Sequence, residues 1–99
     1  MLEIIKQCSY IDSERIGKVT RFSLNGIEGC CVHEKSRYYP DAGYAYTKIS
    51  WNDSVILVSD GENDITGTIP SDEELVELSK AFNTSLYDVI KAIIRSYQI

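Results

Sequence analysis

The feature that most constrains this 99-residue chain is the ordered pattern between Ile65 and Tyr97. It begins with alternating Ile and Thr, which is typical of a strand. Pro70 ends that strand, because proline lacks the N–H group that a sheet ladder needs. Ser71 and Glu74 then have the spacing of a capping box at the start of a helix. The pattern therefore predicts a short strand followed directly by a helix.

Helical periodicity continues on both sides of Asn83, a residue that can adopt the left-handed conformation in which helices end. Ser85 has the hydroxyl group that caps a second helix. The apolar stripes of these two predicted helices are Leu75, Leu78 and Phe82 in the first, and Leu86, Val89, Ile90, Ile93 and Tyr97 in the second. The predicted unit is strand, helix, tight turn, helix.

This order of elements resembles the ribbon-helix-helix family of DNA-binding regulators and antitoxins, over residues 65–97 only. The resemblance implies a homodimer in which the strands of two chains pair and four helices interlock. It further implies that Thr66 and Thr68 face the DNA major groove, and that Thr84 and Ser85 lie at a phosphate. The dimer interface that the family fold implies consists of Ile65, Ile69, Leu78, Phe82, Val89, Ile90 and Ile93.

Two hairpins are predicted upstream of this unit. Asn25-Gly26 lies between two extended runs and suits a two-residue turn with positive φ at both positions, so that Leu24 opposes Ile27. A second hairpin is predicted from residues 44–51 and 54–59. Residues 2–11 are ambiguous between a strand and a short helix, with a slight preference for a strand. The predicted core positions in the hairpins include Phe22, Leu24, Ile49, Trp51, Ile56 and Val58.

Together these patterns predict an α+β fold in which antiparallel β-hairpins precede a strand-helix-helix C-terminal unit. The β-rich part spans residues 1–64, and the ribbon-helix-helix-like unit spans residues 65–99, within one compact domain. The alternative for the second part is a helical hairpin that covers the chain's own sheet.

Net charge bears on two functional hypotheses. The first, which the family resemblance implies, is a small, non-enzymatic transcriptional regulator that binds DNA as a dimer. The chain has 15 Asp and Glu against 10 Lys and Arg, and residues 65–99 hold five acids and three bases, a net of −2. A protein that binds polyanions is usually basic, so the charge argues against DNA binding. The second hypothesis is a small acidic inhibitor, of phage or mobile-element type, that binds and blocks a nucleic-acid-processing enzyme. Its acidic surface would occupy a basic channel of that enzyme.

Four tyrosines surround one Pro-Gly loop, and they are candidates for binding a protein partner. Tyrosine offers a large contact area at a low entropic cost. An equally supported alternative is that these rings pack on the sheet and hold the loop in place. The residues are Tyr38, Tyr39, Tyr44 and Tyr46.

The sequence predicts no enzymatic activity, metal or cofactor. Cys30 and Cys31 would point to opposite faces of a strand, so with His33 they cannot readily share a metal ion. No Gly-rich phosphate loop or hydrolase elbow is present in the sequence. The three cysteines, the lack of a secretory signal and the lack of a long apolar run predict a cytoplasmic protein outside the membrane.

Overall fold

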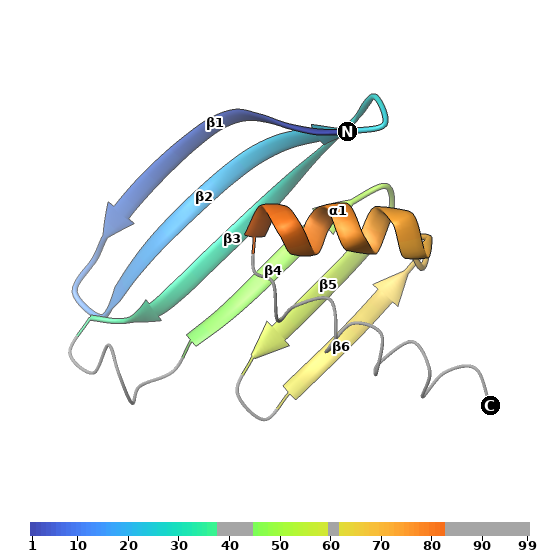
Figure 1. The fold of residues 1–99 in the computed structure, drawn as a ribbon. Helices are drawn as coiled ribbons and strands as arrows, with labels where there is room; N and C mark the ends of the chain where they lie inside the picture. The colour runs from blue at the N-terminus through green and yellow to red at the C-terminus, as the bar shows by residue number, and fades with distance from the viewer. Residues whose placement is uncertain (38–44, 60–61, 83–99) are drawn as a thin grey trace.

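The computed structural model of the chain describes residues 1–37, 45–59 and 62–82, which form an antiparallel sheet of six strands with one helix on one face (Figure 1). Each strand pairs with the next along the chain, so the strand order is the sequence order. The elements are β1 (Leu2–Ile11), β2 (Arg15–Leu24), β3 (Ile27–Ser36), β4 (Ala45–Trp51), β5 (Ser54–Ser59), β6 (Glu62–Gly67) and α1 (Asp72–Phe82).

The turn between β2 and β3 confirms the first predicted hairpin. Asn25 and Gly26 have φ values of 54° and 79°, and Leu24 pairs with Ile27. Positive φ at both central residues matches the right-handed twist of the flanking strands, and Asn and Gly tolerate it best. This turn fixes which side chains of β2 and β3 share a face.

The second predicted hairpin is also confirmed. Asn52 and Asp53 have φ values of 49° and 61°, and Trp51 pairs with Ser54 across the turn. Asn and Asp are the residues other than Gly that most often adopt this conformation.

The start of α1 is the predicted capping box. The Ser71 hydroxyl accepts a hydrogen bond from the Glu74 N–H at 3.2 Å, and the Glu74 carboxylate accepts one from the Ser71 N–H at 2.8 Å. Leu75 and Leu78 are fully buried, whereas Lys80 is exposed on the outer side of the helix. The predicted helical phase of α1 is therefore correct.

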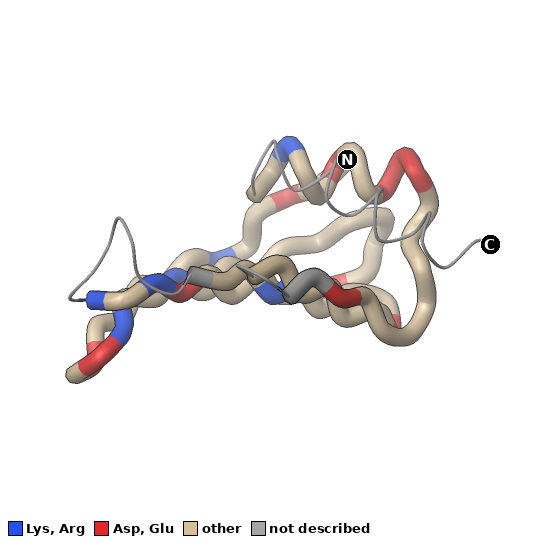
Figure 2. The backbone as a smooth tube through the Cα atoms, turned by 90° about the horizontal axis from the view of Figure 1, so that it is seen from below, with Lys and Arg blue, Asp and Glu red and all other residues tan. Residues whose placement is uncertain are grey.

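The core lies between α1 and the face of the sheet that we call the helix-side face. Figure 2 shows the sheet edge-on with α1 on one side of it. The Trp51 indole N–H donates to the Ile27 carbonyl at 3.0 Å, and the rings of Phe22 and Phe82 have centroids 5.1 Å apart. The buried core residues are Phe22, Leu24, Cys31, Ile49, Trp51, Ile56, Ile65, Leu75 and Leu78.

No described segment covers the opposite face of the sheet, which we call the open face (Figure 2). Its side chains are those that alternate with the core residues along each strand. At the centre of the open face a cross-strand row contains Cys8, Val19, Val32, Lys48 and Leu57.

The predicted fold class is wrong. The described structure is mainly β, because residues 62–67 continue the meander instead of opening a strand-helix-helix unit. Ile65 pairs with Ile56 of β5 in the same chain, and the predicted boundary between residues 64 and 65 falls inside β6. The strand ends at Gly67, which has a φ of 84°, so Ile69 lies beyond the strand and is 44% exposed. The second predicted helix lies outside the described residues.

Residues 2–11, which the sequence left ambiguous, form strand β1. The register of β1 on β2 shifts between Ile4 and Lys6, and this bulge interrupts the alternation of apolar and polar side chains. Ile4 and Ile5 are therefore both about half exposed, at 47% and 46%. The bulge explains why neither a helical nor a strand period was clear in the sequence.

Candidate functional site

One long segment of the chain contains acidic residues and no basic ones. Residues 49–79 contain eight Asp or Glu and no Lys or Arg, and they run from the end of β4 through most of α1. Figure 2 shows the acidic positions of α1 on the helix side of the sheet, away from most Lys and Arg positions. Five of these acids lie on α1 or the β4–β5 turn, and we call them the acidic end: Asp53, Asp72, Glu73, Glu74 and Glu77.

Two hydrogen bonds hold the acidic end together. The Thr68 N–H donates to the Asp53 carbonyl at 3.0 Å, which ties the β4–β5 turn to the segment before α1. The Asn25 side-chain amide donates to the Glu74 carboxylate at 3.3 Å, which ties the β2–β3 turn to the first turn of α1. Three of the acids, Asp72, Glu73 and Glu74, are also favourably placed at the positive end of the helix dipole.

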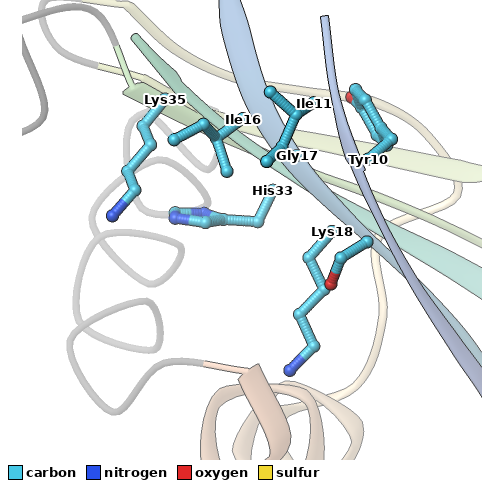
Figure 3. Close-up of a pocket in the computed structure, with 8 residues that line it drawn as sticks. Tyr10, Ile11, Ile16, Gly17, Lys18, His33 and Lys35 are labelled. Carbon is cyan, nitrogen blue, oxygen red and sulfur yellow. The ribbon is translucent and has the colours of Figure 1, made fainter. Parts of the chain in front are cut away.

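A second charged site, of opposite sign, lies on the helix-side face near the β1–β2 turn. It is a cavity of about 490 Å³ with Ile11 and Ile16 among its lining residues. Lys18, His33 and Lys35 also line it, and Figure 3 shows all three extending to the same side of the sheet, while Tyr10 points away. We call this site the cationic pocket.

Strand register brings Lys18, His33 and Lys35 together. Lys18 on β2 pairs directly with His33 on β3, and Lys35 pairs with Ile16. The His33 Nδ1 atom lies 2.9 Å from the hydroxyl oxygen of Thr47 on β4, a buried residue. This hydrogen bond leaves the Nε2 atom of His33 as the ring nitrogen that remains for another ligand.

A carboxylate clamped by tyrosines lies on the open face. Glu34 is only 6% exposed, and its carboxylate accepts hydrogen bonds from the hydroxyl groups of Tyr10 and Tyr46. The Arg15 guanidinium adds a longer contact of 3.5 Å. The Tyr10 ring lies over Gly17, where a Cβ atom would meet it.

These contacts shift the acid–base properties of the clamped groups in opposite directions. Hydrogen bonds from Tyr10 and Tyr46 hold the pKa of Glu34 below its ordinary value. Burial, together with the hydrogen bond to Glu34, raises the pKa of Tyr10 to about 12. The cluster is thus most stable with an ionised Glu34 and neutral tyrosines, which suits a structural anchor for three strands.

The cysteines divide between the two faces as the sequence predicts for Cys30 and Cys31. Cys31 is buried on the helix-side face, and burial raises the pKa of its thiol to about 12. Cys30 is partly buried on the open face, and Cys8 is exposed. Within the described ranges, no group of three or more His, Cys, Asp or Glu side chains is arranged to hold a metal ion.

The predicted DNA-contacting residues are only partly described. Thr66 on β6 and Thr68 after it are exposed, and the acids Asp64 and Asp72 lie close to them in sequence. Thr84 and Ser85 lie outside the described residues. DNA contact by these four residues stays a prediction.

The residues predicted for a dimer interface and for partner binding fall in different places. Ile65 and Leu78 are buried in the chain's own core, Phe82 packs against that core, and Ile69 is exposed. Tyr46 lies on the open face and donates to Glu34. The remaining predicted residues lie outside the described part of the chain: Val89, Ile90 and Ile93 for the interface, and Tyr38, Tyr39 and Tyr44 for partner binding.

Sequence reasoning missed the cationic pocket and the clamped Glu34. The signal for the pocket was present, because the Asn25-Gly26 turn fixes Lys18 opposite His33 and Ile16 opposite Lys35. The clamp requires the register of β1 and β4 as well, and β1 was ambiguous in the sequence.

No helix in the described ranges is long and apolar enough to cross a membrane. Comparison of the chain with protein-family models, with curated proteins and with solved structures found no match.

Proposed function

We propose that this protein is a small, non-enzymatic inhibitor that binds a nucleic-acid-processing enzyme through its acidic end. The observation that carries the proposal is the acidic end, where Asp53 and four acids of α1 belong to a segment, residues 49–79, that contains no Lys or Arg. In this proposal the acidic end occupies a basic groove in which the enzyme normally holds DNA or RNA. Both proteins act in the cytoplasm.

Electrostatics supports this partner chemistry. A surface on which carboxylates outnumber cations, as five acids outnumber Lys80 here, attracts a positively charged groove, speeds association and selects against acidic partners. Glu73 is exposed and Glu77 is partly exposed on the outer side of α1. The helix itself is held rigidly by Leu75 and Leu78 in the core, so these carboxylates are presented at fixed positions.

Charge reversal at the acidic end tests the proposal. The immobilised protein would be incubated with a lysate of the cells in which it acts, and captured proteins identified by mass spectrometry. We expect a nucleic-acid-binding enzyme that wild type retains and that the double variant Glu73→Lys/Glu77→Lys does not. The purified enzyme should lose its activity on DNA or RNA as wild-type protein is added, and added nucleic acid should compete with the protein.

A matched control separates the surface from the net charge. Glu3→Lys/Glu14→Lys changes the charge by the same amount at two exposed residues that do not belong to the acidic end. This control variant should capture the enzyme as wild type does. Equal capture by wild type and Glu73→Lys/Glu77→Lys would contradict the proposal, as would full enzyme activity at saturating protein.

DNA binding by a dimer of this chain is the competing proposal. The lack of Lys and Arg in residues 49–79 weighs against it, because DNA affinity depends on neutralising phosphates. A gel shift with the protein's own promoter region tests it directly. A salt-sensitive, sequence-dependent shift that Thr66→Ala weakens, from a dimer in sedimentation, would favour DNA binding over enzyme inhibition.

A further inference from the structure

The cationic pocket brings positive charges together in a protein whose net charge is −5. Lys18 and His33 are directly opposed on neighbouring strands, and Lys35 lies two residues beyond His33 on the same face. In the described part of the chain, neither Lys18 nor Lys35 forms an ion pair with a carboxylate. An anion of matching size would neutralise the two ammonium groups.

Two acids near the cationic pocket in sequence are held by other partners. Glu34 lies between His33 and Lys35, but strand alternation places it on the open face, where two tyrosines bind it. Asp12, in the β1–β2 turn, accepts hydrogen bonds from the Glu14 N–H at 2.8 Å and the Arg15 N–H at 2.6 Å. None of the described residues that line the cavity is Asp or Glu.

We propose that the cationic pocket binds a small organic phosphate, with the phosphate held by Lys18, His33 and Lys35. Two ammonium groups match the double negative charge of a phosphate monoester, and the His33 Nε2 atom is free to contact a third oxygen. The Thr47 hydroxyl fixes the plane of the imidazole through Nδ1. A carboxylate would satisfy one positive charge and leave the other unpaired.

The rest of the cavity determines the kind of phosphate. Ile11 is 67% exposed and Ile16 is partly exposed, and both line the cavity beside the cations. A cavity of about 490 Å³ is larger than inorganic phosphate needs and suits a ligand of nucleotide size. We therefore infer that an aromatic or apolar part of the ligand lies on the two isoleucines.

Four probes of the full-length protein test this assignment: adenosine 5′-monophosphate, its 3′,5′-cyclic monophosphate, adenosine and inorganic phosphate. Binding would be measured by titration of the amide resonances in heteronuclear NMR. The monophosphate should bind most tightly, the cyclic form with its single charge more weakly, and adenosine and inorganic phosphate most weakly. The largest shifts should come from the amides of β2 and β3 near Lys18, His33 and Lys35.

Variants locate the site. Lys18→Ala and Lys35→Ala should each weaken binding of the monophosphate by about three- to tenfold. Lys48→Ala, an exposed lysine on the open face of the same sheet, should leave binding unchanged. Added salt should weaken binding to wild type more than to Lys18→Ala, because screening acts on the charged contacts.

Three results would overturn the proposal: no binding of the monophosphate at millimolar concentration, equal binding of adenosine and the monophosphate, or equal losses in Lys48→Ala and Lys18→Ala. The substituted lysines are exposed, so these variants should fold, and circular dichroism checks that they do. Phosphate binding by the cationic pocket does not depend on enzyme inhibition by the acidic end. The variant Glu73→Lys/Glu77→Lys tests that inhibition on another surface.

Discussion

The two faces of the sheet are stabilised in different ways, although the same strands supply both. On the helix-side face, alternate residues such as Phe22 and Leu24 are buried completely under α1. On the open face, the residues between them, such as Arg21 and Ser23, remain in contact with solvent. Strand alternation therefore separates a dry core from a surface whose stability depends on cross-strand pairs.

On the open face, contacts between side chains of neighbouring strands take the place of a covering layer. Val19 and Val32 pair across β2 and β3 and are partly buried, and Glu34 is buried by the tyrosine side chains above it. Pairs of this kind contribute about 0.2–1 kcal/mol each, whereas complete burial of a leucine side chain contributes about 1.5–3 kcal/mol. Substitutions on the two faces should differ accordingly.

The largest expected effect comes from α1. Leu78→Ala removes a fully buried side chain, and we expect a loss of about 2–5 kcal/mol in the free energy of unfolding, from lost apolar burial and a residual cavity. Val32→Ala on the open face should cost about 1 kcal/mol, because Val32 is only partly buried. Urea denaturation measures both, and equal losses would contradict the division between a covered and an open face.

Alanine substitution of one glycine on each face should give the next largest losses of stability. At Gly29, an added Cβ would lie 2.6 Å from the Phe22 ring, 2.8 Å from the Ser50 carbonyl oxygen and 2.9 Å from the Trp51 ring. These atoms belong to the backbone and the packed core, so Gly29→Ala should cost about 1–3 kcal/mol or more.

Gly17→Ala is the matched substitution on the open face. Its Cβ would meet the Tyr10 ring, which can rotate into solvent with the loss of its hydrogen bond to Glu34. We expect a loss of about 1.5–3 kcal/mol, typical of a hydrogen bond to a charged group. If Gly17→Ala also destabilised a Tyr10→Phe background by the same amount, the hydrogen bond would not be the cause.

Local signals predicted the parts of the fold that depend on a few neighbouring residues. Asn25-Gly26 specified the register of β2 and β3, and Ser71 with Glu74 specified the start of α1. The alternation of Ile65 and Thr66 is the same in a strand that pairs with another chain and in a strand that pairs with β5. The choice between them depends on long-range pairing, which a local pattern does not contain.

The candidate sites were predictable to different degrees. The acidic end was hidden because the expected boundary between residues 64 and 65 divided the base-free segment 49–79. The cationic pocket follows from the β2–β3 register, but only if Ile16 and Lys18 belong to a strand. Residues 12–17 read as a connection because they are charged and end in Gly17, whereas β2 begins at Arg15.

Substitution of Glu34 should change the free energy of unfolding by an intermediate amount that depends on pH. The pKa of Glu34 is lowered in the folded protein, so its contribution to stability is present above about pH 4.5 and is lost as pH falls through the folded pKa. Glu34→Gln should be about 1–3 kcal/mol less stable than wild type at pH 7, and the difference should shrink below pH 4.5.

Tyr10, which donates a hydrogen bond to Glu34, should make the stability of the protein depend on pH in the alkaline range. The pKa of Tyr10 is raised from 10.0 to about 12, so the stability that it contributes is present below pH 10 and is lost as pH rises toward 12. Tyr10→Phe should remove this alkaline dependence. Thermal denaturation across pH measures both sides, and an unchanged acid profile in Glu34→Gln would show that another carboxylate controls it.

The smallest expected effect belongs to the exposed ion pair of the open face. Arg21 donates to the Glu28 carboxylate at 3.2 Å, with about half of each side chain in solvent, 53% for Arg21 and 63% for Glu28. Exposed pairs contribute about 0.2–1 kcal/mol, because solvent screens the charges and two long side chains lose rotamer freedom. A double-mutant cycle of Arg21→Ala and Glu28→Ala should give a coupling energy in this range, and high salt should reduce it. A salt-independent coupling above about 2 kcal/mol would mean that the pair is desolvated, and hence that some other part of the chain or a second copy covers the open face in solution.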